Sequence, residues 1–116
     1  MKTDFTVSVL AKAMNLRLQK HSAIASNLAN ADTPGFRPRS VSFEESLQQA
    51  VERRDTRQLG GLQARIEITD DGVPRLDGNS VSVDKQMAEM TENSTVYSAT
   101  AEFLRRKLGM IKRVIE

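Results

Sequence analysis

The chain contains no cysteine and no tryptophan, and its 116 residues include only one tyrosine and four phenylalanines. Without cysteine, disulfides and thiolate metal sites are excluded. So few aromatic side chains also argue against a thick sandwich or barrel, because a compact domain of this length needs a bulky core. The apolar residues are mainly Ala, Val, Leu, Ile and Met, a mixture typical of long helices packed side by side. We therefore predict a mainly α fold.

Charge of one sign and long apolar runs are scarce as well. The formal net charge is +2, too near balance to require a polyanionic partner. Residues 1–39 carry six basic and two acidic groups, residues 67–92 two and seven, and residues 102–116 five and two. This asymmetry would suit an assembly in which the basic ends of one copy contact the acidic middle of another. A charged face exposed to solvent would also explain it.

No apolar run approaches the length of a membrane span, and the N-terminus lacks the apolar core of a cleaved signal peptide. Ordinary targeting rules therefore predict a soluble cytoplasmic protein. These rules do not detect an export route that recognises an uncleaved N-terminus.

Heptad spacing predicts one long helix at each end of the chain, from Thr3 to about Ala31 and from an N-cap at Ser82 onward. A sustained 3.5-residue period indicates a left-handed coiled-coil seam. We expect the two helices to pair as an antiparallel-type coiled coil, with residues 1–32 and 81–116 as axial helices of one structural domain and residues 33–80 as a turn motif and irregular arm. The predicted seam comprises Val7, Met14, Leu18, Leu28, Met87, Met90, Tyr97, Leu104, Leu108 and Ile111.

A second apolar stripe runs along the far side of each helix. Burying a large apolar side chain is worth about 1.5 to 3 kcal/mol, so these stripes require a cover. Either the middle of the chain folds over them or neighbouring copies cover them, and we favour the neighbours. A lone pair of helices would then be marginal and largely disordered as a monomer. The predicted inter-subunit stripe comprises Val9, Leu16, Val96, Phe103 and Met110.

The middle of the chain has weaker patterns. Ser42 and Glu45 have the spacing of a capping box, which predicts a short helix with Phe43, Leu47 and Val51 on one face. Residues 64–69 alternate like a strand, and residues 73–76 beyond an Asp-Gly turn would complete a small β-hairpin. A loose arm held by neighbours and a closed subdomain both fit this pattern.

The residues that would carry chemistry are few. His21, the one histidine, lies on the inner stripe of a helix, where we interpret it as a packing or interfacial residue. No phosphate-binding loop, zinc-protease helix or calcium loop occurs. The basic residues near the C-terminus are spaced seven residues apart beside the apolar stripes. This spacing is typical of charges that flank a coiled-coil seam, and it does not indicate a phosphate-binding face. We predict no catalytic residues, no cofactor, no metal, no small-molecule substrate and no nucleic-acid partner.

Residues 26–39, SNLANADTPGFRPR, end the first helix. Pro34 disfavours helix at the residue before it, and Pro34-Gly35 suits the centre of a type II turn with a positive φ at Gly35. Asn27 and Asn30 lie one helical turn apart, where their amides can bind backbone groups of the turn or of a neighbouring helix.

The string NLANADTPGF resembles the motif of the bacterial flagellar axial proteins, which build the rod and hook. The segment from DGNSVSVDKQ to GMIKRVI is similar to the terminal helix of the proximal-rod group, including its Asp-Gly-Asn, Glu-Asn-Ser and Lys-Leu-Gly-Met-Ile-Lys. Phe36 replaces the commoner tyrosine, so that hydroxyl is absent. The resemblance assigns to the motif turn Asn27, Asn30, Asp32, Thr33, Pro34, Gly35 and Phe36.

The resemblance implies a structural, non-enzymatic subunit. Copies would stack helically into the hollow periplasmic rod, which transmits torque and forms part of the export channel. They would leave the cytoplasm through the flagellar type III apparatus without a cleaved signal. The implied partners are further copies, other rod proteins, and the membrane-ring and export-gate proteins at the rod base. The alternative is a cytoplasmic coiled-coil adaptor or oligomerisation protein.

Overall fold

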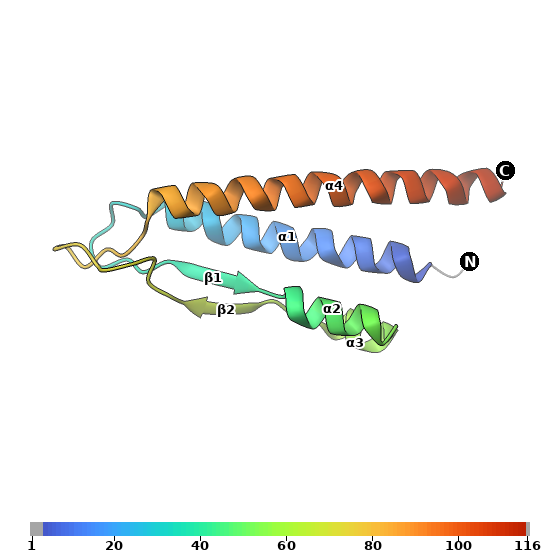
Figure 1. The fold of residues 1–116 in the computed structure, drawn as a ribbon, viewed down its shortest axis with the longest axis horizontal. Coiled ribbons are helices and arrows are strands. Elements are labelled where there is room, and N and C mark those ends of the chain that lie inside the picture. Colours follow the sequence, from blue (N-terminus) through green and yellow to red (C-terminus); the bar gives the residue numbers. More distant parts are fainter. Residues whose placement is uncertain (1–3, 116) are drawn as a thin grey trace.

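The computed structural model describes residues 4–115 as a rod with extents of 62 × 24 × 17 Å. Helix α1 (Phe5–Ala29) and helix α4 (Val83–Ile115) lie side by side and antiparallel, so that the start of α1 and the end of α4 lie at the same end of the rod (Figure 1). A middle arm runs along the same direction. It consists of β1 (Arg39–Ser42), α2 (Glu44–Glu52), α3 (Thr56–Gly61) and β2 (Arg65–Ile68). The mainly helical fold with paired terminal helices is therefore confirmed.

Both long helices begin at a side-chain cap. The carboxylate of Asp4 accepts a hydrogen bond from the Thr6 backbone N–H at 2.8 Å. The hydroxyl of Ser82 accepts one from the Lys85 backbone N–H at 3.3 Å, which confirms the predicted N-cap of α4. Such bonds satisfy backbone donors that the first turn leaves unpaired. Helix α1 ends at Ala29, two residues before the predicted end.

The two strands form an antiparallel pair, with Arg39 opposite Ile68 and Ser42 opposite Arg65. Strand β2 confirms the alternation in residues 64–69, but the predicted partner at residues 73–76 is wrong. Residues 73–76 instead belong to a local turn in which the backbone N–H of Arg75 donates to the Asn79 carbonyl at 2.8 Å. Helices α2 and α3 connect β1 to β2, so the pair is not a hairpin.

The start of α2 also differs from the prediction. The N-cap is Phe43, and it makes no side-chain capping bond, so the Ser42–Glu45 capping box is wrong. Ser42 is the last residue of β1 and pairs there with Arg65. The carboxylate of Glu44 instead accepts from the Phe43 backbone N–H at 3.0 Å. Pairing in the sheet therefore takes precedence over a local cap.

The hydrophobic core lies between α1 and the arm. Leu16 of α1 is fully buried, and the other buried members of this cluster all come from the arm, namely Val41, Phe43, Ala50, Leu59 and Leu62. Val9 and Ala23 pack against the same cluster. We predicted that neighbouring copies would cover Val9 and Leu16. For Leu16 this is wrong, and for Val9 it is wrong in part, because the chain's own arm folds over this stripe of α1.

Candidate functional site

The turn after α1 has the predicted geometry. The backbone N–H of Phe36 donates to the Thr33 carbonyl at 3.2 Å across Pro34 and Gly35. Gly35 has a φ of +75°, as the third position of a type II turn requires. The amide of Asn30 donates to the Ser26 carbonyl at 2.9 Å, and its oxygen accepts from the Thr33 hydroxyl at 3.1 Å. The turn is therefore fixed to the last turn of α1.

The loop before α4 clamps this turn through Asn79, which is fully buried. Its side-chain amide donates to the carbonyl of Asn30 at 2.9 Å and to that of Thr33 at 2.8 Å. Its side-chain oxygen accepts from the Val81 backbone N–H at 2.9 Å. Two segments far apart in the sequence, NLANADTPGF and DGN, therefore form one hydrogen-bonded unit.

Two glycines allow this close contact. The backbone N–H of Gly35 donates to the Asp77 carbonyl at 2.9 Å. Gly78 has a φ of +83°, and a Cβ placed on it would lie 3.3 Å from the Cα of Gly35. A larger residue at Gly78 would meet both a strained backbone conformation and a neighbouring main chain.

Asn27 joins three elements while almost fully buried, at 1% exposure. Its amide donates to the Arg39 carbonyl at 2.9 Å and to Oε1 of Gln86 at 3.0 Å. Its oxygen accepts from the Arg39 backbone N–H at 2.9 Å. The Asn27 side chain therefore bonds both the N–H and the carbonyl of Arg39, as the main chain of a neighbouring strand would. It also connects α1 to α4 through Gln86.

The contact between α1 and α4 is polar at its most buried points. Besides Asn27 and Gln86, the side chain of Asn93 is buried and bonds Arg17 twice. Its amide donates to the Arg17 carbonyl at 2.9 Å, and its oxygen accepts from Arg17 Nη1 at 3.3 Å. Near the terminal end, Lys107 Nζ lies 3.1 Å from Oδ2 of Asp4. Paired polar groups of this kind fix the register of two helices.

Acidic residues at the opposite end of the molecule belong to the same loop. The guanidinium of Arg37, and next the hydroxyl of Ser80, hold the pKa of the Asp70 carboxyl below its ordinary value. Asp71 accepts from the Ser82 backbone N–H at 2.8 Å and from Gln86 Nε2 at 3.0 Å. These carboxylates therefore connect the loop to the start of α4.

Neither a metal cluster nor a membrane-spanning helix occurs in residues 4–115. No group of three or more His, Cys, Asp or Glu side chains in this range is arranged to hold an ion. None of the helices in this range combines the length and the apolar character needed to cross a bilayer.

The family model for the flagella basal body rod protein matches residues 8–37, which hold most of α1 and the turn. The chain is also 27% identical to the flagellar basal body rod protein FlgB of Escherichia coli (strain K12), over 99% of this chain and 96% of that protein. FlgB of Bacillus subtilis (strain 168) is 29% identical over 95% of this chain and 92% of its own length. The chain is therefore similar to the flagellar basal body rod proteins along nearly its whole length.

FlgB of Aeromonas hydrophila, 29% identical over 86% of this chain and 85% of that protein, is a further relative. The similarity to these relatives includes the arm as well as the two helices. The rod-family motif turn and the Asp-Gly-Asn loop are the two segments that Asn79 joins. Within this chain, Asn27, Asn30 and Thr33 of the motif turn bond to other segments, whereas Asp32 and Pro34 are exposed.

Three residues of the predicted seam are about half exposed. Leu18 and Met87 are each 50% exposed and Leu108 is 48% exposed. The remaining seam residues are half-buried: Val7, Met14, Leu28, Met90, Tyr97, Leu104 and Ile111. Because the arm covers another side of α1, Leu18 and Tyr97 border an open face of the two-helix pair.

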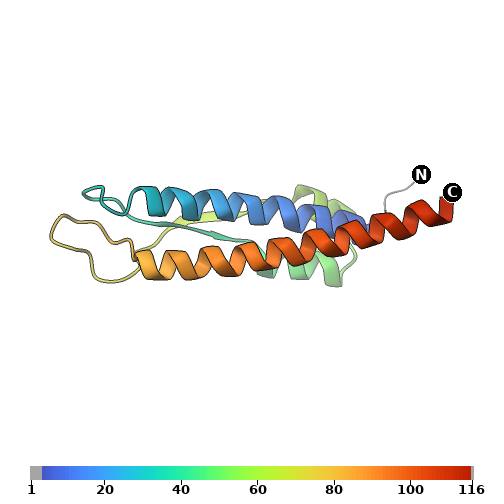
Figure 2. The ribbon, with the colours of Figure 1, turned by 90° about the horizontal axis from the view of Figure 1, so that it is seen from above.

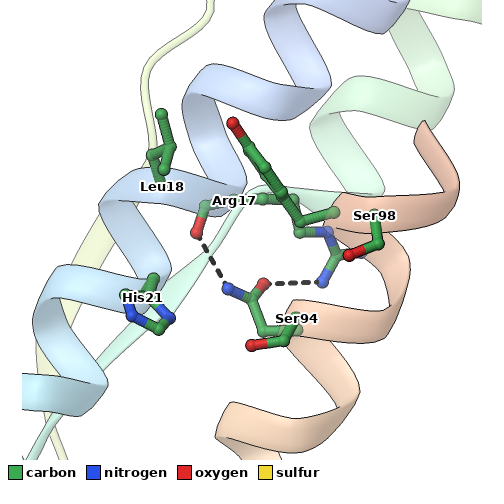
Figure 3. A pocket seen from close by; sticks show the side chains of 7 residues that line it. Arg17, Leu18, His21, Ser94 and Ser98 are labelled. Atoms are coloured by element: carbon green, nitrogen blue, oxygen red, sulfur yellow. Dashed lines mark hydrogen bonds between the residues drawn. The ribbon is translucent and has the colours of Figure 1, made fainter. Parts of the chain in front are cut away.

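Figure 3 shows part of this open face, a hollow of about 280 Å³ between α1 and α4. Leu18 and His21 border it from α1, and Ser94 and Ser98 border it from α4. Arg17 crosses between the helices beside it. Small serines next to an exposed leucine leave room for a further helix to approach closely. His21 is exposed here, and its place fits the interfacial role predicted for it.

The outer stripe of α4 remains uncovered along its C-terminal half. Val96 is half-buried beside the arm, whereas Phe103 is 61% exposed and Met110 is 57% exposed. The arm therefore covers the α1 stripe only, and the α4 stripe remains a candidate contact surface between subunits.

Sequence patterns did not identify the buried polar residues Gln86, Asn93 and Asn79. Gln86, Asn93 and Thr100 are spaced seven residues apart on α4, but apolar heptad spacing does not include polar side chains. The available signal was a polar side chain at every seventh position of α4, on a line between the two apolar stripes. The role of Asn79 depends on a contact with a turn 46 residues earlier, which no local pattern contains.

Proposed function

We propose that the chain polymerises helically into the proximal part of the flagellar basal-body rod, where it transmits torque and contributes to the export channel. The likeness to the rod proteins along nearly the whole chain supports a structural subunit of the basal body. The proximal position is supported by the likeness of its terminal helix to the proximal-rod group.

The observation that carries the proposal is the uncovered apolar surface on a locked two-helix rod. The Asn79 clamp and the Asn27 and Asn93 bonds fix the two helices relative to each other. Phe103, Met110 and Leu108 are nevertheless about half exposed or more. A rigid element with apolar side chains on its outside fits a subunit whose helices are covered by neighbours.

We further propose that the neighbours are copies of this chain, other rod proteins, and the membrane-ring and export-gate proteins at the rod base. The likeness to the rod proteins supports assembly with other flagellar components. The open face beside Leu18 and Tyr97 and the α4 stripe at Phe103 lie on different sides of the rod. Two separate surfaces allow one subunit to contact more than one neighbour.

The proposed location is the periplasmic section of the basal body, reached through the flagellar type III apparatus without cleavage of a signal. A thin helical rod with a small core suits this route, because little structure must unfold before export. The folded state would then be stabilised by assembly after export. No catalytic activity is proposed for the chain.

Deletion of the chain's gene tests the function. Swimming in soft agar and electron microscopy of isolated basal bodies are compared among the parent, the deletion strain and the deletion strain carrying a plasmid copy. We expect the deletion strain to be non-motile and to lack rods, and the plasmid to restore both. Intact rods in the deletion strain, with the protein present as a discrete cytoplasmic oligomer, would instead identify an adaptor.

A further inference from the structure

The last two turns of α4 extend beyond the start of α1 (Figure 2). Lys107 pairs with Asp4, the cap of α1, so residues 108–115 continue past that helix by about 12 Å at 1.5 Å per residue. We call residues 108–115 the overhang. Among its apolar side chains, Met110 is 57%, Val114 85% and Ile115 65% exposed.

A second uncovered feature is an apolar groove of about 380 Å³ between α2 and α4, with α1 as its floor. Leu47 and Val51 of α2 form one wall, Val96 of α4 forms the other, and Val9 of α1 lies at the base. Phe103 follows Val96 at seven on the same stripe of α4 and is 61% exposed. The groove is therefore continuous with the exposed apolar stripe of α4.

We propose that the overhang of one copy lies in the α2–α4 groove of a second copy. This inference rests on the proposed rod function and names the partner of its exposed stripe. The overhang cannot fill the groove of its own chain, because α4 is one unbroken helix that forms a groove wall at Val96 and then leads away from it. The occupant must come from another molecule.

Charge identifies a second copy as the occupant. The overhang contains two basic residues, Lys112 and Arg113, and no acidic one. Helix α2 contains three acidic residues and no basic one; Glu44 is already paired with Lys20 at 2.9 Å, while Glu45 and Glu52 are exposed. Opposite charges on two surfaces guide their encounter and select the partner. The apolar Met110 and Val114 would enter the groove, and Arg113 would remain near its acidic rim.

The contact would propagate. The overhang and the groove are different surfaces, so joining them is a heterologous contact that extends from copy to copy instead of closing at a dimer. Residue 98 is the middle of the groove wall that Val96 and Thr100 form on α4, and residue 111 lies near the middle of the overhang. A parallel neighbour would therefore be displaced along the rod by the distance between these two positions, about 20 Å at 1.5 Å per residue. Such an axial step between neighbours is a feature of helical assemblies.

Engineered cysteines test the contact without background, because the chain has none of its own. Val51→Cys marks the groove and Met110→Cys marks the overhang, and both sites are exposed, so the fold is retained. The double variant is expressed in the deletion strain, and isolated basal bodies are mildly oxidised and separated by non-reducing electrophoresis. The matched control replaces Val51→Cys with Gln49→Cys, which lies on α2 outside the groove.

We expect the double variant to give a ladder of disulfide-linked multimers of this chain, and the Gln49 control to give at most a trace. Each single-cysteine variant can form no more than a dimer. No ladder in basal bodies that contain the chain, or a link to a different protein, would overturn the contact between copies while leaving the rod function intact. Normal rods in the deletion strain would reject the rod function itself, so the two failures are distinguishable.

Discussion

Asn93 of α4 and Arg17 of α1 hold each other through two hydrogen bonds. The amide of Asn93 donates to the Arg17 main-chain carbonyl at 2.9 Å, and its oxygen accepts from the Arg17 guanidinium at 3.3 Å. Arg17 also lies over the Phe43 ring, 5.0 Å from its centroid. This one contact therefore connects α4, α1 and the arm, and it lies between the predicted seam residues Met90 and Tyr97.

The Asn93 contact predicts a loss of stability on truncation. Asn93→Ala removes both of these hydrogen bonds at a buried position, and we expect a loss of about 1 to 3 kcal/mol in the free energy of unfolding. The measurement is a urea melt followed by circular dichroism, in a fixed concentration of trimethylamine oxide that strengthens a marginal fold. The neighbouring exposed Ser94→Ala should change the value by less than about 0.5 kcal/mol. Equal melts for the two variants would contradict the role of Asn93.

The approach of Gly78 to Gly35 predicts that Gly78 resists substitution. Gly78→Ala combines a φ of +83° with a Cβ 3.3 Å from the Gly35 main chain. We expect a loss of about 1 to 3 kcal/mol in the same melt, because a non-glycine residue in that conformation is strained. Gly72→Ala is the matched control, since nothing lies within 4 Å of its Cβ. A neutral Gly78→Ala would show that the two motif segments do not need this close contact.

The arm's cover over α1 predicts a strong dependence on Leu16. Leu16 is fully buried, so Leu16→Ala should lower the free energy of unfolding by about 2 to 5 kcal/mol. Leu18→Ala, at a 50% exposed position two residues later, should cost about 1 kcal/mol or less. Comparable losses at both positions would mean that the arm does not pack on α1 in solution.

The sequence allowed prediction of the long elements and not of the way they are covered. Helix ends follow from local chemistry, so Ser82, the Pro34-Gly35 turn and the length of α4 were predictable. Strand β2 was also predictable, but its partner was not, because pairing with β1 depends on contacts between residues 23 to 29 positions apart in sequence. A local Asp-Gly turn signal led to the wrong partner.

The core was misassigned for a related physical reason. Apolar periodicity gives the faces of a helix but not what packs on each of them, so Leu16 was assigned to a neighbour although Phe43 and Leu59 cover it. The polar residues Gln86 and Asn93 occupy the centre of the contact between α1 and α4. A search that counts only apolar residues therefore shifted the seam to flanking positions such as Met87 and Leu108.

The Asp70 carboxyl predicts an acid-sensitive loop. Arg37 first, and Ser80 next, lower its pKa from the ordinary value of 3.8. Because the folded-state pKa is the lower one, the stabilisation is fully present above about 3.8 and is lost as the pH falls through the lowered value. An NMR titration of the Asp70 side chain should give a midpoint below 3.8, and Arg37→Gln should raise it. A midpoint that Arg37→Gln leaves unchanged would contradict this ion pair.

Phe103→Asp tests most directly the claim that exposed apolar faces of this chain are covered by neighbouring subunits. Phe103 is 61% exposed, so the change leaves the fold of the single chain intact but places a charge on the α4 stripe. Phe103→Leu and Thr95→Asp serve as controls for apolar character and for an added charge elsewhere on α4. Export into the periplasm and the presence of basal bodies are measured in the deletion strain carrying each variant. We predict that Phe103→Asp is exported normally but builds no rods, while both controls swim. Normal rods with Phe103→Asp would contradict the account.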